Sequence, residues 1–128
     1  AAEKVKYSTI WAAYEIKISS IHVPDGVVEN ILSGLNPVAF GLLENYYMAN
    51  NCFFEEGQLL DNTDKIQGIP AVLVNGRYDM ICPPLAAYRL HKKLPGSRLI
   101  IAENSGHWMG EKEIERALIS AMKEFEKE

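Results

Sequence analysis

The first third of the chain carries apolar residues at helical spacing. Side chains one helical turn apart share a face that can pack against another element. Pro24, Asp25 and Gly26 then provide a turn that ends the pattern. The sequence therefore predicts a helix before this turn. Its apolar positions are Ile10, Trp11, Tyr14, Ile18 and Ile21.

A capping signal indicates a second helix. Asn36 suits the N-cap position, and Pro37 suits the first helical position, where its missing N–H costs nothing. The helix is expected to end near residue 50. The first sixty residues are therefore predicted to be helical, without strands. The apolar positions of this second helix are Phe40, Leu43, Tyr46 and Tyr47.

The pattern changes after the polar stretch 55–64. A branched, continuous apolar run at residues 69–74 is typical of a buried parallel strand. A helix that begins at Pro83 and Pro84 and a second short strand at residues 99–102 follow, and then a closing amphipathic helix up to Phe125. The order strand, helix, strand, helix predicts an α/β fold in which a right-handed crossover joins two parallel strands.

Two parallel strands are few for such a fold. Parallel sheets normally have both faces covered, and an isolated pair leaves backbone edges open. The helical first half cannot supply further strands. We therefore expect either that the chain is the carboxyl half of a larger α/β protein, or that it completes its sheet with another chain, including a second copy bound through the exposed sheet edge.

Composition narrows the class of protein. The 128 residues are 48% hydrophobic and 23% charged, as in a compact globular domain. The net charge of -4, with the 13 basic residues scattered, argues against nucleic-acid binding.

No run reaches the roughly 18 apolar residues of a membrane span, and residues 1–4 do not begin a signal peptide. We expect the protein to be cytoplasmic and to make no contact with a membrane. Because the chain begins with Ala1, we expect it to be processed, trimmed or part of something longer.

Cys52 and Cys82 show no disulfide-scaffold or metal-site spacing, so both are expected to be reduced thiols, with no metal bound.

Two polar residues follow the two predicted strands. Asp79 stands five residues after Val74, and His107 stands five residues after Ala102. Each alone is most often structural, as a turn acid or a loop histidine. Together, in this chain order, they match the second and third members of the Ser, Asp, His triad of α/β-hydrolases.

The segment 72–83, with its run Gly-Arg-Tyr-Asp-Met followed by Cys82, resembles the acid loop of proline iminopeptidases. Gly106-His107 resembles the catalytic histidine loop of that family, and Trp11-Ala12-Ala13-Tyr14-Glu15 resembles its Trp-x-x-Trp-Glu motif. Glu44-Asn45-Tyr46-Tyr47 resembles its Glu-Asn-His-Tyr motif, and Pro95 matches a Trp-Pro ending in which Leu94 replaces Trp. The resemblance covers nearly the whole chain. It implies a helical cap segment at 1–62 and an α/β-hydrolase core segment at 63–128.

The resemblance also implies roles for five residues. Asp79 would orient the imidazole, and His107 would act as general base and then as general acid. Glu15 and Glu44 would bind the charged amine of a peptide with N-terminal proline, and Cys82 would line the proline pocket. The reaction would need no cofactor. For the two glutamates the alternative is a nearby Lys or Arg partner or a solvent-facing position, and for Cys82 it is a small buried side chain.

The chain departs from the family pattern in several places. Tyr46 replaces His, Met48 replaces Phe, and Trp108 replaces Ser after the histidine; Glu111-Lys112 stands where Glu-Pro is common. No Gly-x-Ser-x-Gly elbow or Gly-rich oxyanion segment occurs in the 128 residues, and Ser33-Gly34 and Ser105-Gly106 are the nearest approximations.

Three functions follow from these features. The first is the carboxyl part of a proline iminopeptidase-like serine hydrolase whose nucleophile lies in a missing amino-terminal half. The second is an inactive truncated hydrolase that acts as a binding or self-assembly module. The third is an esterase or epoxide-type hydrolase of the same fold, which leaves the paired cap glutamates without a role.

Overall fold

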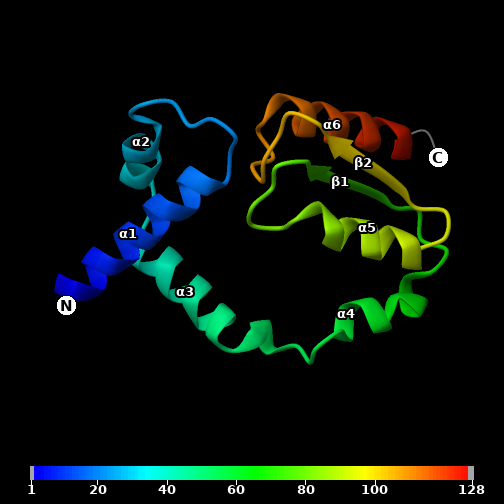
Figure 1. Ribbon diagram of the computed structural model, residues 1–128, viewed down its shortest axis with the longest axis horizontal. Coiled ribbons are helices and arrows are strands. Elements are labelled where there is room, and N and C mark those ends of the chain that lie inside the picture. Colours follow the sequence, from blue (N-terminus) through cyan, green and yellow to red (C-terminus); the bar gives the residue numbers. More distant parts are fainter. Residues whose placement is uncertain (1, 127–128) are drawn as a thin grey trace. The chain divides into compact units, whose positions relative to one another are not determined.

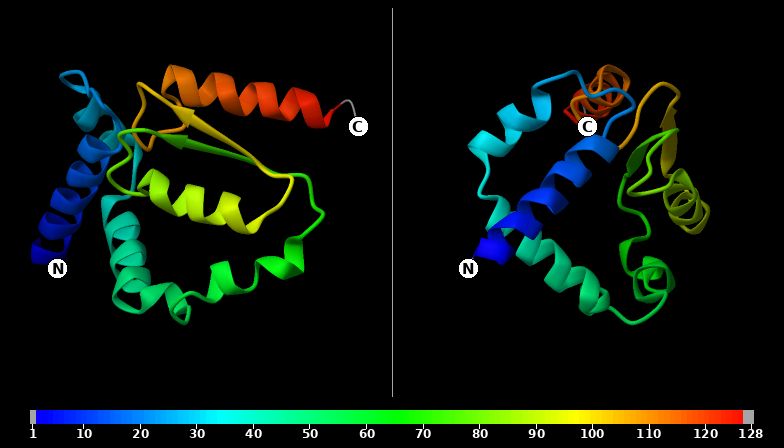
Figure 2. Two further views of the ribbon diagram at one scale, coloured as in Figure 1. Left: turned by 45° about the vertical axis from the view of Figure 1, so that its right-hand side comes forward. Right: turned by 60° about the vertical axis from the view of Figure 1, so that its left-hand side comes forward.

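The computed structural model describes residues 2–126. Contacts divide this part of the chain into two units (Figures 1 and 2). The helical unit contains the chain up to Ile18 and residues His22–Glu56, and the strand-bearing unit contains Ser19–Ile21 and the chain from Gly57 onward. The boundary expected at residue 62 stays a prediction.

The helical unit contains three α-helices and a short 3-10 helix. They are α1 (Ala2–Ile18), α2 (Val27–Gly34), α3 (Pro37–Ala49) and η1 (Asn51–Phe53). Figure 2 shows α1 and α3 side by side. Small residues allow this close approach, because a Cβ added at Gly41 of α3 would lie only 3.2 Å from the Cα of Ser8 in α1. The two helices therefore pack through small buried residues, and many of their larger apolar side chains remain exposed.

The capping signal correctly located α3. The Asn36 side chain accepts a hydrogen bond from the Ala39 amide at 3.1 Å, and Pro37 is the first helical residue. The first predicted helix is also present, but it begins at Ala2 and ends at Ile18, so Ile21 lies outside it and is 51% exposed. The helix α2 was not predicted, because only the turn at 24–26 was recognised there.

The strand-bearing unit holds the sheet. Two short helices, α4 (Gln58–Asp61) and the 3-10 helix η2 (Thr63–Ile66), occupy the stretch expected to be polar connection. The strand β1 (Val72–Gly76), the helix α5 (Pro84–Lys93), the strand β2 (Arg98–Ala102) and the helix α6 (Lys112–Phe125) then follow in the predicted order. In Figures 1 and 2, α5 and α6 lie on opposite sides of the strand pair, and both contact β1 and β2.

The two strands are parallel, as predicted, and their register runs from Val72 opposite Arg98 to Gly76 opposite Ala102. The predicted limits and burial of the first strand were wrong in detail. The strand starts at Val72, and Ile69, placed in it by the pattern, is 63% exposed. Residues 72–75 are half-buried and not fully buried, because the sheet of the described residues has two strands and one helix on each face.

Candidate functional site

The loop after β1 places Asp79 in a buried position. Its side chain is almost fully covered, and the whole residue is 7% exposed. Carboxylate oxygen Oδ1 accepts hydrogen bonds from the Ile81 amide at 2.9 Å and from the Cys82 amide at 2.7 Å. This local turn, which an aspartate readily forms, fixes the direction of the second oxygen.

The loop after β2 brings His107 to that second oxygen. The distance from His107 Nδ1 to Asp79 Oδ2 is 3.0 Å, and the imidazole is 39% exposed. With Asp79 ionised, its Oδ2 can only accept, and this contact then assigns the proton of the neutral ring to Nδ1 and leaves the lone pair on Nε2. The structure thus brings together the two residues that the sequence singled out, 28 positions apart.

Backbone hydrogen bonds join the two loops directly. The Arg77 amide donates to the Ala102 carbonyl at 2.9 Å, and the Tyr78 amide donates to the Ser105 carbonyl at 3.0 Å. A Cβ at Gly76 would lie 2.5 Å from the Ser105 carbonyl oxygen. The loops therefore approach as closely as a glycine allows.

The carboxylates of Glu103 and Glu113 accept further hydrogen bonds that involve the histidine loop. The Arg77 guanidinium donates twice to the Glu103 carboxylate, with both distances 2.6 Å; this contact raises the pKa of Arg77 and lowers the pKa of Glu103. The Asn104 backbone amide and side-chain amide both donate to Glu113, which lowers the pKa of that carboxyl. Each contact links the histidine loop to a neighbouring part of the unit.

Cys82 is exposed and unpaired, so the alternative of a small buried side chain is wrong for this position. Partial burial of the thiol and the nearby negative charge of Asp79 raise its pKa above the usual value. The thiol therefore stays protonated at neutral pH, and a protonated thiol is a poor nucleophile. Cys52 is also unpaired.

The two cap glutamates both belong to the helical unit. Glu44 is half-buried, and its Oε2 accepts a hydrogen bond from the Trp11 indole nitrogen at 2.6 Å. The ion pairs among the described residues do not include Glu44, so its partner is a neutral donor and not the Lys or Arg of the alternative interpretation. Glu15 is half-buried and lies one helical turn after Trp11 on α1.

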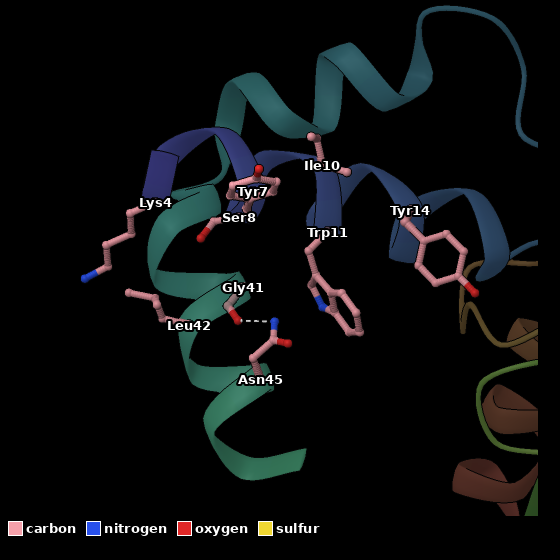
Figure 3. Close-up of a pocket in the computed structure, with 9 residues that line it drawn as sticks. All are labelled: Lys4, Tyr7, Ser8, Ile10, Trp11, Tyr14, Gly41, Leu42 and Asn45. Carbon is pink, nitrogen blue, oxygen red and sulfur yellow. Dashed lines mark hydrogen bonds between the residues drawn. The ribbon is translucent and has the colours of Figure 1, made fainter. Parts of the chain in front are cut away.

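An open, mainly apolar groove of about 640 Å³ lies between α1 and α3, and Trp11 is one of its walls (Figure 3). Figure 3 shows Trp11 and Tyr14 projecting from α1 on the side where Asn45 projects from α3. The sequence indicated Trp11 and Tyr14 as apolar helix positions and as family motif positions, but it did not predict the groove. The lining residues are Lys4, Tyr7, Ser8, Ile10, Trp11, Tyr14, Gly41, Leu42 and Asn45.

Residues 2–126 contain no group of three or more His, Cys, Asp or Glu side chains placed to hold a metal ion. Within the same residues, no helix has the length and apolar character needed to cross a membrane.

Comparisons with known proteins relate this geometry to a family. A family model described as TAP-like protein matches residues 40–125. A probable proline iminopeptidase of Leptolyngbya boryana is 40% identical over 116 residues, which are 90% of this chain and 36% of that protein. A proline iminopeptidase of Xanthomonas citri is 38% identical over 125 residues, which are 97% of this chain and 40% of that protein.

A solved structure agrees on the fold. The esterase EaEST from Exiguobacterium antarcticum superposes with a TM-score of 0.63 at 23% sequence identity, over 95% of this chain and 47% of the esterase. The predicted class, a partial α/β-hydrolase fold, is confirmed. This chain spans 36% and 40% of the length of the two relatives described above. It belongs to the TAP-like family of α/β-hydrolases, and its resemblance to the proline iminopeptidases is confirmed.

Proposed function

We propose that this chain supplies the acid and the base of a proline iminopeptidase-like serine hydrolase, which releases N-terminal proline from peptides. The contact between Asp79 and His107 is the observation that carries this proposal. The names of the relatives in Leptolyngbya and Xanthomonas support the substrate class.

In the proposed reaction, Nε2 of His107 accepts the proton of a serine hydroxyl as the oxygen attacks the carbonyl carbon of the prolyl residue. Asp79, held by two backbone amides, orients the ring and stabilises the imidazolium that forms. The imidazolium then donates its proton to the leaving amine as the peptide bond breaks. Water hydrolyses the acyl-enzyme in a second round of the same proton transfer, which returns the serine and releases proline.

The serine itself is proposed to lie outside the 128 residues. None of them forms a Gly-x-Ser-x-Gly elbow, and Ser105, which stands next to Gly106, is fully buried in the loop after β2. A nucleophile must reach both the base and the substrate, so a buried loop serine does not fit the role.

Glu15 and Glu44 are proposed to bind the amine of the substrate. A half-buried carboxylate whose partner is the neutral Trp11 indole keeps a negative charge for which a cationic ligand is a natural complement. Cys82 is proposed to contribute a neutral wall to the proline pocket, in agreement with its raised pKa.

A chimaera tests the function directly. Residues 2–126 would replace the matching segment of the Xanthomonas citri relative, which is 38% identical over 125 residues. The chimaera should release product from a prolyl arylamide, and His107→Ala should lower kcat by about 10⁴-fold or more. The unmodified 128-residue chain, assayed alone, should be inactive. A folded chimaera without activity, or one that His107→Ala leaves unchanged, contradicts the proposal.

The same chimaera tests the two glutamates. Glu15→Gln combined with Glu44→Gln should raise KM for the prolyl substrate while changing kcat much less, because an amine contact acts mainly in binding. Glu29→Gln on the exposed surface of α2 is the matched control and should leave KM unchanged. Equal KM values in all three proteins would refute the assigned role.

A binding or self-assembly module is the second candidate. The open edges of the two-stranded sheet favour it, because unpaired strand edges readily pair with another chain. An inactive, correctly folded chimaera would support this candidate over the hydrolase.

A further inference from the structure

A short segment far from His107 in the sequence lies against the histidine loop. The Ser19 carbonyl oxygen accepts hydrogen bonds from the His107 amide at 2.7 Å and from the Trp108 amide at 2.8 Å. Contacts place Ser19–Ile21 in the strand-bearing unit, although the residues on both sides of it belong to the helical unit. These three residues are called the strap below.

Gly106 shows how tightly the strap is packed. A Cβ added to this glycine would lie 2.9 Å from the Ser19 carbonyl oxygen and 3.2 Å from the Ser20 Cα. Both neighbours are backbone atoms, which cannot move aside as a flexible side chain does. The residue immediately before His107 is therefore a glycine because the strap occupies the space of a side chain.

Glu111 links the same two segments through its side chain. Carboxylate oxygen Oε2 accepts from the Gly106 amide, and Oε1 accepts from the Ile21 amide at 3.1 Å. The ion pairs among the described residues do not include Glu111, so these backbone donors are the contacts that stabilise its charge. Each oxygen thus holds a different segment, one next to His107 and one in the strap.

We propose that Glu111 is a positioning residue for His107, because its carboxylate ties the Gly106 amide to the strap and so fixes the backbone from which the imidazole reaches Asp79. This inference rests on the proposed function, in which His107 is the base. The hydrogen bonds of Glu111 among the described residues go to backbone amides and not to the imidazole. Glu111 acts through the backbone on the amino side of His107, while the Ser19 carbonyl holds the amides of His107 and Trp108.

Glutamine at this position removes one of the two links. Its amide has a single acceptor oxygen, and its NH₂ group cannot accept from a backbone N–H. Glu111→Gln therefore keeps at most one of the two backbone hydrogen bonds and loses the charge that strengthens both. Glu115→Gln is the matched control, because Glu115 is an exposed residue in α6, the helix that Glu111 precedes as N-cap, and undergoes the same change in charge.

The test is nuclear magnetic resonance of the full 128-residue chain. In the unmodified protein the ring nitrogens of His107 should report the Nδ1–H tautomer, with a downfield Nδ1 proton. Glu111→Gln should remove that proton signal and speed exchange of the Gly106 or Ile21 amide by at least about ten-fold. Exchange of the β1 and β2 amides should stay unchanged, which separates a local effect on His107 from a loss of fold. Glu115→Gln should match the unmodified chain.

An unchanged His107 signal and unchanged exchange in Glu111→Gln would overturn the inference. If Glu111→Gln does not fold, Ile21→Pro replaces it, because proline lacks the backbone N–H that donates to Glu111 and residue 21 is exposed. In that case, a His107 signal in Ile21→Pro that matches the signal of the unmodified chain would overturn the inference. Loss of the signal in Ile21→Pro would support the inference. Failure of the proposed function has a different signature, namely no prolyl release by the chimaera while the effect of Glu111→Gln on the His107 signal is present.

Discussion

Gly76 ends β1 directly against the backbone of the histidine loop. The space of its missing side chain is filled by the carbonyl oxygens of Ser105 and Gly106. Nothing in the sequence around residue 76 identifies this contact, because the residues that fill the space follow the next strand along the chain. The histidine and the aspartate were predictable as a pair, whereas the glycines that let their loops meet were not.

Gly76→Ala should destabilise the chain strongly. The added methyl group must push backbone atoms apart, and overpacking of this kind costs about 1–3 kcal/mol or more in the free energy of unfolding. Gly34→Ala is the control, because a Cβ there meets nothing within 4 Å and a helical alanine is favoured over glycine by up to about 1 kcal/mol. Urea unfolding followed by circular dichroism measures both. A Gly76→Ala midpoint at or above the unmodified value would contradict the close approach of the loops.

Asp79→Asn should inactivate the chimaera while leaving its fold intact. The amide oxygen can still accept from the Ile81 and Cys82 amides, but the NH₂ group then faces His107 Nδ1 and favours the wrong tautomer. The expected loss in kcat is about 10⁴-fold. Asp64→Asn, at an exposed position of η2, should leave kcat unchanged. Substantial activity in Asp79→Asn would argue against the role of the carboxylate.

Helices and strands with a strong local sequence signal were predicted, whereas the helix α2, which depends on tertiary contacts, was not. Asn36 and Pro37 together indicate the start of α3, and the apolar run at residues 69–74 indicates β1. The eight residues of α2 begin after Gly26, whose φ is 78°, and they pack against α1. Short helices are marginal alone and depend on tertiary packing, so a contact of this kind decides them.

The hydrogen bonds from Asn104, in the loop after β2, to Glu113 of α6 predict that acid lowers the stability of the fold. Hydrogen bonds from Asn104 lower the pKa of Glu113 below its usual 4.5. The folded pKa is thus lower than the unfolded one, so the contribution to stability is complete above the unfolded value and is lost as the pH falls through the folded value. Glu103, whose pKa is lowered by Arg77, acts in the same direction.

Glu113→Gln should therefore reduce the fall in the urea midpoint between about pH 7 and about pH 3.5, because it removes one of the groups whose pKa differs between the folded and unfolded states. Glu115→Gln, an exposed position on the same helix, should show the same fall as the unmodified chain. If the two variants show equal falls, the hydrogen bonds between Asn104 and Glu113 do not contribute to the acid sensitivity.

At the scale of the whole molecule, the described residues leave strand edges and large apolar side chains exposed. The described sheet has two strands, and large apolar side chains such as Leu43, Leu59, Met80 and Met122 are each at least 61% exposed. Open strand edges and exposed apolar surface favour association with another chain.

The isolated chain should therefore self-associate. Sedimentation velocity at increasing protein concentration should give a rising mean mass, because edges and apolar surface are available to a second copy. The chimaera is the control and should sediment at one mass, because we expect the rest of the relative to cover the same surface. A monomer at every concentration would contradict self-assembly through the sheet edge.

Local patterns along the chain predicted α1, α3, α5 and α6, the parallel strand pair, the family resemblance, and the two residues that follow the strands. Periodicity, capping and turn residues act over a few positions, so they can be read along the chain. The folded structure was needed to show how the two loops meet at Gly76, how the strap and Glu111 hold the histidine loop, and that Glu44 is bonded to Trp11. The contacts from Trp11 to Glu44 and from Ile21 to Glu111 join residues 33 and 90 positions apart, and which atoms meet across such separations depends on the packing of the whole unit.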